Sequence, residues 1–227
     1  MTKPYGRQTK KQVNTLLRGK DRNHALGLLA QIPDAQLVGH LFSHFYDRDE
    51  VIKFRSITAM GQLGKRLVQT HMEKARNLMR RLMWNLNDES GGIGWGSPEA
   101  MGEILFQSPA LALEYKSILF SYLDPKGNFI EHEPLQQGVL WGIGTYLGTA
   151  PQEMDKTTRE VLFSHLHSPD PVKRGYAVRA LIKANSLDRL TLPAHLLRDS
   201  ETIQIFTDWN FVPTPISDMV SAMAQER

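Results

Sequence analysis

An internal repeat of about forty residues constrains the fold more than any other feature of this sequence. The segment LFSHFYDRDEV, which begins at Leu41, aligns without a gap with LFSHLHSPDPV, which begins at Leu162. Related segments begin at Leu82 and Leu119, so the motif recurs at intervals of 41, 37 and 43 residues. A period of this length is typical of stacked helical pairs, because one pair cannot bury its apolar face alone.

A second motif of small and apolar residues runs in phase with the first. The spacing of Leu37, Leu41 and Phe45 is that of one helical face, and no strand alternation competes with it. Small residues let two helix axes approach closely, and prolines at 33, 109, 151 and 193 separate the two segments of a unit. We therefore predict an all-α fold, an α-solenoid of about five helical hairpins. The small-residue segments are Ala25-Leu26-Gly27, Ala59-Met60-Gly61, Ala100-Met101-Gly102, Gly142-Ile143-Gly144 and Ala180-Leu181-Ile182.

Two corresponding segments carry a resemblance to a known repeat family. Asp49-Glu50-Val51-Ile52-Lys53 and Asp170-Pro171-Val172-Lys173-Arg174, each followed by a small-residue segment, resemble the HEAT-like repeats of phycobilisome-lyase relatives over about residues 12 to 199. The segment GGIGWGSPEAMGEIL, from Gly91 to Leu105, also looks like a family of small uncharacterised HEAT-repeat proteins of anaerobic sulfate- or metal-reducing bacteria. The resemblance implies an α-α superhelix and no particular activity.

The end of the chain departs from the repeat pattern. Ile203, Ile205 and the run from Trp209 to Val212 predict short strands around Thr207-Asp208. We expect Pro213 and Pro215 to stop regular pairing before Ser217 caps a helix over 218–225. The predicted organisation is a basic N-terminal segment (1–11), a HEAT-like repeat array (12–199) and a C-terminal strand and helix cap (200–227) that covers the end of the solenoid.

Composition excludes several classes of chemistry. The chain has no cysteine, which removes disulfides, thiolate metal sites and thiol nucleophiles. No apolar run approaches the ~18 residues that a membrane helix needs, and the N-terminus lacks the apolar core of a signal peptide, so we expect a cytoplasmic protein without a membrane partner. Residues 1–22 carry seven bases and one acid, whereas residues 88–133 carry eight acids and two bases.

The longest connections within the array are Asn87 to Ser97 and Asp124 to Glu133. Equivalent loops of a solenoid emerge on the same edge, so these two loops are expected to lie side by side with Glu99, which opens the next helix. The glycine-rich loop either wraps a ligand or makes a tight turn that Trp95 plugs. The candidate binding residues of this region are Glu89, Gly92, Gly94, Trp95, Glu99, Glu131, His132 and Glu133.

Helix geometry adds two candidates on the outer surface. Trp84 and Arg80 fall opposite the apolar stripe of their helix, where the other units have serine in place of Trp84. They form either a contact surface or a site covered by the glycine-rich loop. The single His132-Glu133 dyad is too few ligands for a di-iron site, and we predict no metal or other cofactor.

Three functions remain open at this level. We expect a non-enzymatic interaction or scaffold module that binds a protein or peptide on the inner face of the solenoid. The alternative is a small-ligand, metal-binding or enzymatic site in the acidic pocket between loops 87–97 and 124–133. The second alternative is weak, sequence-independent nucleic-acid binding through residues 1–22. The non-functional interpretation of this segment is a solubilising, partly disordered tail. Oligomeric state cannot be deduced from the sequence.

Overall fold

Short polar residues and prolines set the helix boundaries. The carboxylates of Asp21, Asp49 and Asp155 accept backbone N–H bonds in the first turns of α2 (Arg22–Leu29), α4 (Glu50–Thr70) and α9 (Lys156–His165), as N-cap residues do. Proline occupies the first turn of α7 (Pro109–Ser121) and α10 (Pro171–Lys183), where no helical hydrogen bond is lost. Of the four prolines that we expected to separate the two segments of a unit, Pro33 and Pro109 lie at the starts of α-helices, and Pro151 and Pro193 lie at the starts of short 3-10 helices.

The computed structural model describes residues 4–87, 93–187 and 191–225. Over these ranges the chain is mostly helical, with one small antiparallel sheet, as predicted. The elements are α1 (Pro4–Arg18), α2 (Arg22–Leu29), α3 (Asp34–His44), α4 (Glu50–Thr70), α5 (Met72–Asn87), α6 (Ser97–Gln107), α7 (Pro109–Ser121), α8 (Glu133–Leu147), η1 (Pro151–Glu153), α9 (Lys156–His165), α10 (Pro171–Lys183), η2 (Ala194–Arg198), β1 (Thr202–Thr207), β2 (Asn210–Pro215) and α11 (Ile216–Gln225).

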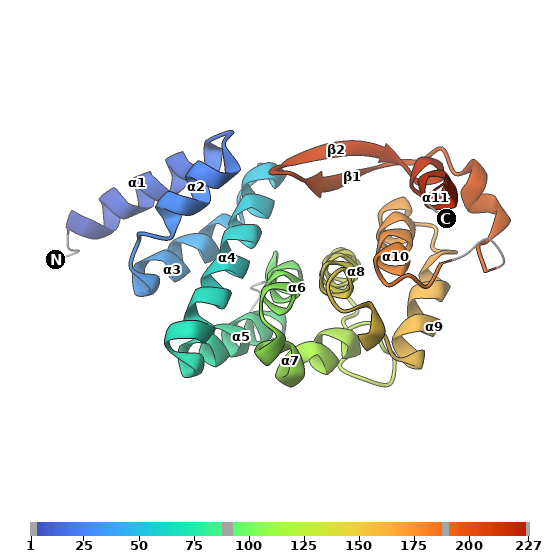
Figure 1. Cartoon of the computed structure of the whole chain (residues 1–227), viewed down its shortest axis with the longest axis horizontal. Helices are drawn as coiled ribbons and strands as arrows, with labels where there is room; N and C mark the ends of the chain where they lie inside the picture. Colours follow the sequence, from blue (N-terminus) through green and yellow to red (C-terminus); the bar gives the residue numbers. More distant parts are fainter. Residues whose placement is uncertain (1–3, 88–92, 188–190, 226–227) are drawn as a thin grey trace.

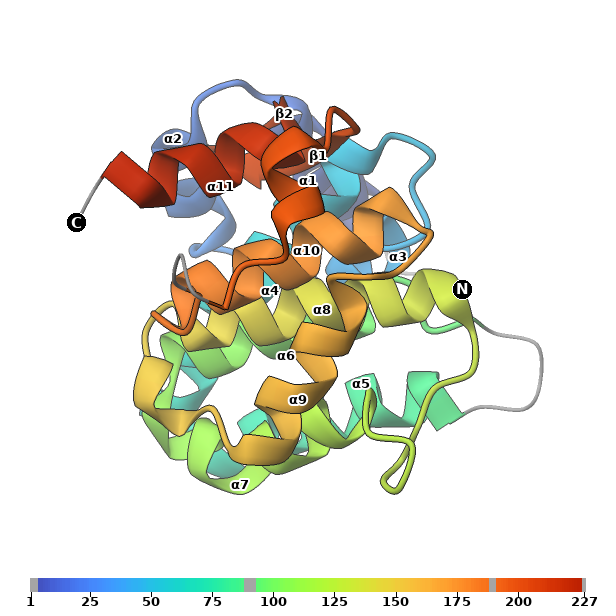
Figure 2. The same ribbon diagram turned by 90° about the vertical axis from the view of Figure 1, so that its right-hand side faces the viewer.

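Helices α4, α6, α8 and α10 lie side by side in the middle of the molecule (Figures 1 and 2). Helices α5, α7 and α9 lie on one side of this row, and the β1–β2 hairpin crosses its other side (Figure 1). Helices α1, α2 and α3 flank α4 at the N-terminal end. The buried apolar side chains of all these layers form one continuous core.

The small-residue segments lie where helices approach most closely. A Cβ atom added at Gly102 of α6 would lie 2.3 Å from the carbonyl oxygen of Gly142 in α8, and one added at Gly142 would lie 2.4 Å from the Pro98 carbonyl oxygen. These contacts are backbone against backbone. No side chain larger than hydrogen fits there without moving the two helices apart.

The hairpin is longer than the sequence suggested. Pro213 pairs with Gln204 and Pro215 with Thr202, so the prolines do not stop the pairing that we expected them to end. A two-stranded ribbon leaves an outer edge on each strand, where the missing N–H of a proline loses no partner. Helix α11 consequently follows β2 directly, beginning at Ile216 and packing on α10.

The hairpin reaches from α10 to the opposite end of the helical row (Figure 1). At its tip, the indole Nε1 of Trp209 donates to the carbonyl oxygen of Gly19, 2.9 Å away, in the α1–α2 connection. Arg55 of α4 donates to the Trp209 carbonyl at 2.8 Å and to the Leu17 carbonyl at 2.9 Å. The C-terminal segment therefore does more than cover one end of the helical row, because the tip of its hairpin is hydrogen-bonded to the connection between α1 and α2 at the other end.

Residues 4–18, which we interpreted in part as a disordered tail, form helix α1. Its apolar stripe, Val13, Leu16 and Leu17, is buried in the core, while the charged residues Arg7, Lys10 and Lys11 face solvent. The amphipathic spacing of Val13, Leu16 and Leu17 is present in the sequence, but we interpreted the segment from its many basic residues instead. None of the helices in the described ranges is both long enough and apolar enough to cross a membrane.

Candidate functional site

The predicted loop site is only partly assembled. Glu89 and Gly92 lie outside the described residues. Gly94 packs so closely on α5 that an added Cβ would lie 2.6 Å from the Asn85 carbonyl oxygen, and Gly96 has a φ of +74° before α6. Close packing and backbone conformation therefore account for both of these glycines.

Lysine side chains accompany the carboxylates of this region. Trp95 stacks edge-on against His132 with ring centroids 5.5 Å apart. The Lys53 ammonium lies 5.8 Å from the Trp95 ring and 3.9 Å from the Glu99 carboxylate, and Lys173 pairs with Glu133 at 3.2 Å. Glu131 is exposed. Glu99 and Glu133 thus have cationic partners within the chain itself.

Glu99 is buried deeply at the start of α6. Its Oε2 has no hydrogen-bond partner among the described residues, and burial raises its pKa against the opposing effect of Lys53. A Cβ at Gly138 of α8 would lie 2.7 Å from this oxygen, so the glycine makes room for the carboxylate. Within the same described ranges no group of three or more metal-ligating side chains occurs.

Trp84 and Arg80 lie apart from this cluster on α5. Trp84 is 70% exposed, so the described part of the glycine-rich loop does not cover it. The Arg80 guanidinium is held by Glu73 at 2.7 Å and by Asn77 at 2.6 Å on the same helix. No contact between described residues links either side chain to Trp95 or His132.

A polar cavity, which we did not predict from the sequence, lies beneath the hairpin. We call it the hairpin cavity; its volume is about 390 Å³. It is open to solvent on one side, and helices α2, α4, α6, α8 and α10 and the tip of the hairpin line it. Its lining residues are Arg22, Thr58, Glu103, Phe106, Gln107, Thr145, Gly148, Arg179, Lys183, Phe206, Thr207, Asp208 and Trp209.

Arg179 forms the charged floor of the hairpin cavity. Its guanidinium carbon lies 3.7 Å from the centroid of the Trp141 ring, and it donates to the Trp141 carbonyl and to Thr145 Oγ1, each at 3.1 Å. Among the described residues no carboxylate oxygen lies within 4.0 Å of its nitrogens. Burial lowers the pKa of Arg179 to about 10. It remains a cation at neutral pH, without a direct counter-ion.

Glu103, one turn after Glu99 on α6, is a second charged group of the cavity and is partly buried. Burial raises its pKa, although Arg179 and Arg22 act in the opposite direction. Arg22 and Lys183, together with Asp208 at the hairpin turn, complete the charged lining.

The sequence held one signal for these residues. Arg179 lies in Tyr176-Ala177-Val178-Arg179-Ala180 and Glu103 precedes Ile104-Leu105, so each charge interrupts an otherwise apolar helical run. Charged residues on buried helix faces are rare unless they are paired or functional. The distance along the chain between the two hid their proximity.

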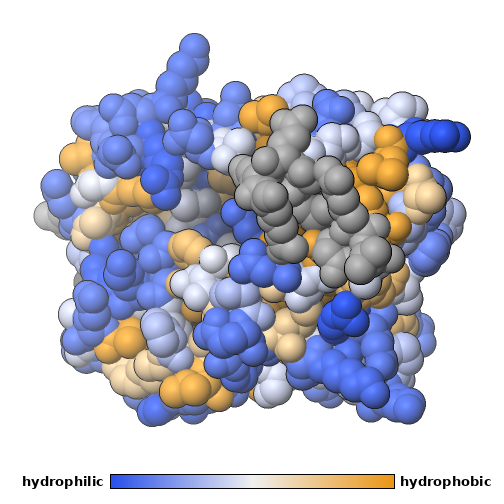
Figure 3. Space-filling view, turned by 45° about the vertical axis from the view of Figure 1, so that its right-hand side comes forward, coloured by the Kyte–Doolittle hydropathy of each residue, from blue (hydrophilic) through white to orange (hydrophobic). Residues whose placement is uncertain are grey.

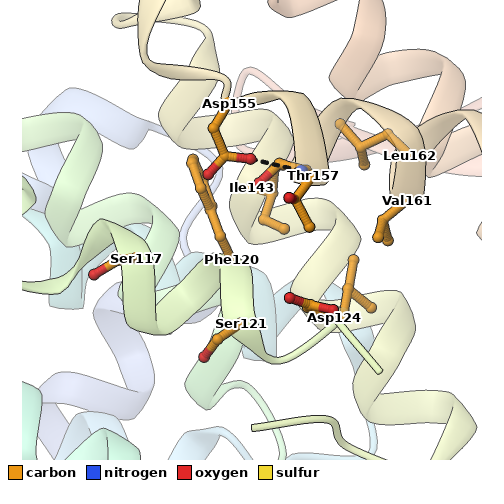
Figure 4. A pocket seen from close by; sticks show the side chains of 11 residues that line it. Ser117, Phe120, Ser121, Asp124, Ile143, Asp155, Thr157, Val161 and Leu162 are labelled. Carbon is orange, nitrogen blue, oxygen red and sulfur yellow. Dashed lines mark hydrogen bonds between the residues drawn. The ribbon is translucent and has the colours of Figure 1, made fainter. Parts of the chain in front are cut away.

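A smaller cavity of about 170 Å³ between α7 and α9 is less promising (Figure 4). Its carboxylates already accept hydrogen bonds from the local backbone: Asp155 accepts from the Thr158 N–H at 2.6 Å, and Asp124 accepts from the Lys126 N–H at 2.9 Å. The hairpin cavity has five charged side chains in its lining, whereas this smaller cavity has two.

The surface seen in Figure 3 is largely hydrophilic, with apolar groups in small patches.

Comparisons with known proteins leave the function open. No family model matches the chain. A protein of Archaeoglobus fulgidus, described only as uncharacterised, is 25% identical over 186 residues, which is 82% of this chain and 94% of that protein. The crystal structure of an engineered protein superposes with a TM-score of 0.44 and 17% sequence identity, over 78% of this chain and 79% of the other. Structural similarity at that level supports no inference.

Proposed function

We propose that this protein is a binding protein and not an enzyme, built as a HEAT-like array of about five helical pairs, whose ligand places an anionic group in the hairpin cavity. The array is supported by the succession of α2 and α3, α4 and α5, α6 and α7, and α8 and α9, each of which carries the two in-phase motifs. The glycine contact between α6 and α8 is of the kind that closely stacked repeats require.

The observation that carries the ligand proposal is the partly buried guanidinium of Arg179, which has no ion-pair partner within 4.0 Å among the described residues. Removing a charge from water is unfavourable, and an anion that enters the cavity offsets this penalty through charge-assisted hydrogen bonds. Two hydrogen bonds and the Trp141 ring hold the guanidinium in place, so little side-chain entropy is lost on binding.

Two neighbouring groups favour an anion as well, because Arg22 and Lys183 add positive charge to that of Arg179. The carboxyl groups of Glu103 and Asp208 stand against these three cations. A carboxylate or phosphate group therefore matches this lining better than a cation does.

Calorimetric titration with acetate and with inorganic phosphate tests the proposal. Arg179→Gln is expected to weaken binding by about tenfold to a hundredfold, the effect of losing a hydrogen bond to a charged group. Arg179→Lys keeps the charge but not the planar fork, and is expected to bind with intermediate affinity.

Arg159→Gln is the matched control. That guanidinium also stacks on an aromatic ring, 4.6 Å from the centroid of Phe163, but it lies on the exposed face of α9. Circular dichroism verifies that each variant is folded. Absence of binding by the parent, or equal binding by the parent and Arg179→Gln, contradicts the proposal.

One observation favours a second candidate function, the binding of a protein partner by α5. Trp84 is exposed on the same helix as Arg80, and tryptophan and arginine are enriched at interface hot spots. A photo-reactive phenylalanine analogue at position 84 is expected to cross-link one specific protein in an extract of the source organism. The control carries the analogue at Leu113, which is 78% exposed on α7. Identical products from both positions contradict this candidate.

A further inference from the structure

A groove whose exposed surface is mostly apolar lies between α3 and α5. We call it the α3–α5 groove; its volume is about 260 Å³. Both helices pack on α4, and the groove separates them (Figure 1). Its lining residues are Asp34, Ala35, Val38, Leu67, Lys74, Asn77, Leu78 and Arg81. None of them lines the hairpin cavity, so this surface is separate from the proposed anion site.

Side chains at the rim supply the apolar surface of the groove. Ala35 is exposed and Val38 is partly exposed, whereas Leu67 and Leu78 are almost completely buried. The apolar surface therefore belongs to Ala35, Val38 and the hydrocarbon stems of the longer side chains beside them. The groove has room for roughly one or two apolar side chains of a partner, since a cavity of ~150 Å³ holds a benzene ring.

Two cations on α5 flank this apolar surface. Lys74 and Arg81 are exposed, and neither has an ion-pair partner among the described residues. The Arg81 guanidinium lies 4.1 Å from the centroid of the Phe42 ring, which limits its freedom before a partner binds. The carboxylate of the groove, Asp34, is already paired with Arg66, whose Nε lies 2.8 Å from its Oδ1. The groove therefore offers unpaired positive charge to a partner.

We infer that the α3–α5 groove docks an amphipathic helix of a partner protein, with apolar side chains in the groove and two acidic side chains at Lys74 and Arg81. The two cations are seven residues apart on α5, which is two helical turns or about 10.5 Å. Acids seven residues apart on a partner helix match this separation, and the residues between them on the same face enter the groove. The inference goes beyond the anion site and does not depend on it.

The charges of α5 favour a helix over a nucleic acid. The other two cations of α5, Arg76 and Arg80, are already paired with Glu73, so the helix presents no continuous positive stripe. A nucleic-acid backbone carries a negative charge every few ångströms and has no apolar side chain that would fill the groove.

Fluorescence anisotropy with two labelled synthetic peptides tests the inference. The first is an alanine-based helix of about twenty residues, with two glutamates seven residues apart and two leucines between them. The second has the same composition, but its glutamates are five residues apart and therefore lie on different faces. We expect the parent protein to bind the first peptide at least threefold more tightly, because the second forms only one of the two ion pairs. Equal affinities, or absence of binding, overturn the inference.

Charge reversal locates the bound peptide. Lys74→Glu/Arg81→Glu is expected to weaken binding of the first peptide at least tenfold, because both ion pairs become repulsive. Lys65→Glu/Arg159→Glu is the matched control, because it reverses an exposed lysine and an exposed arginine that also stacks on a ring, outside the groove. Equal weakening by the two double variants contradicts the inference.

Two further variants separate this groove from the anion site. Ala35→Trp fills the groove from an exposed position and is expected to weaken peptide binding at least tenfold, whereas Leu113→Trp, on α7, is expected to bind like the parent. Arg179→Gln is expected to bind the peptide like the parent, whatever its effect on acetate or phosphate. Loss of peptide binding in Arg179→Gln overturns the inference, as does tighter binding of a single-stranded oligonucleotide through Lys74 and Arg81. Circular dichroism verifies that each variant is folded.

Discussion

The contact between Gly102 of α6 and Gly142 of α8 allows a quantitative test of helix packing. In Gly102→Ala the new methyl group would lie 2.3 Å from the Gly142 carbonyl oxygen and 2.4 Å from its Cα. Ordinary contact distances are ~3.5–4.0 Å, so the helices must separate by roughly 1 Å. Both neighbouring atoms belong to backbone, and no rotamer change relieves the clash.

Two opposing effects decide the sign of the change. Alanine gains ~1 kcal/mol of helix propensity over glycine. Separating α6 from α8 weakens packing along the whole interface, and overpacking of this kind costs ~1–3 kcal/mol or more. Because the obstacle is backbone on both sides, we expect the upper end of that range, which leaves a net destabilisation of about 2 kcal/mol. The melting temperature then falls by roughly 4–8 °C for a chain of this size.

Gly39→Ala is the matched control for this experiment. Gly39 lies within α3, is exposed, and has no atom within 4 Å of the added Cβ. Only the propensity gain applies there, so Gly39→Ala is expected to stabilise the fold by about 0.5–1 kcal/mol. Urea unfolding followed by circular dichroism at 222 nm measures both variants. If Gly102→Ala is as stable as the parent, the close approach of α6 and α8 is refuted.

Trp209→Ala is expected to destabilise the protein by about 3–5 kcal/mol, as for other buried aromatic residues, because it removes the anchor at Gly19. Val212→Ala, at a 46% exposed position of the same hairpin, is expected to change stability by less than about 1 kcal/mol, and equal melting temperatures for the two variants contradict the anchor. Burial raises the pKa of Glu99, so its contribution to stability is present below the ordinary glutamate pKa and is lost as pH rises through the raised value. Glu99→Gln is therefore expected to lose less stability than the parent as the pH rises above the ordinary glutamate pKa, and an unchanged pH profile in urea unfolding argues against this. Replacing Arg7, Lys10 and Lys11 by Gln, which spares the buried face of α1, is expected to reduce any nucleic-acid affinity and to flatten its salt dependence by ~0.9 for each phosphate that is no longer neutralised; a salt dependence equal to that of the parent contradicts this.

The predicted helices and the small-residue segments agree with the structure because both are encoded locally. Helices α3 and α7 can be predicted from the sequence, because apolar spacing, capping residues and first-turn prolines act within a few residues of one another. The glycines of α6 and α8 were predicted to bring helices together, and Gly102 and Gly142 do so. The turn at Thr207-Asp208 was also predicted, because its signal lies in residues that are adjacent in the sequence.

The candidate site depended on information that a local pattern does not contain. Equivalent loop positions led to Trp95 and His132, which are in contact, but did not indicate that Lys53 would accompany Glu99. Trp84 was chosen for its exposure, and exposure alone does not place a side chain near a second group.

By itself the sequence determined that the chain is mostly helical and which small residues allow close packing. Only the tertiary structure decided that a hairpin near the C-terminus reaches Gly19 and Arg55, and that Arg22, Glu103 and Arg179 line one cavity. The physical reason is range. Helix formation depends on neighbours within a few turns, whereas these contacts join residues separated by more than seventy positions, and only the packing of the whole chain brings them together.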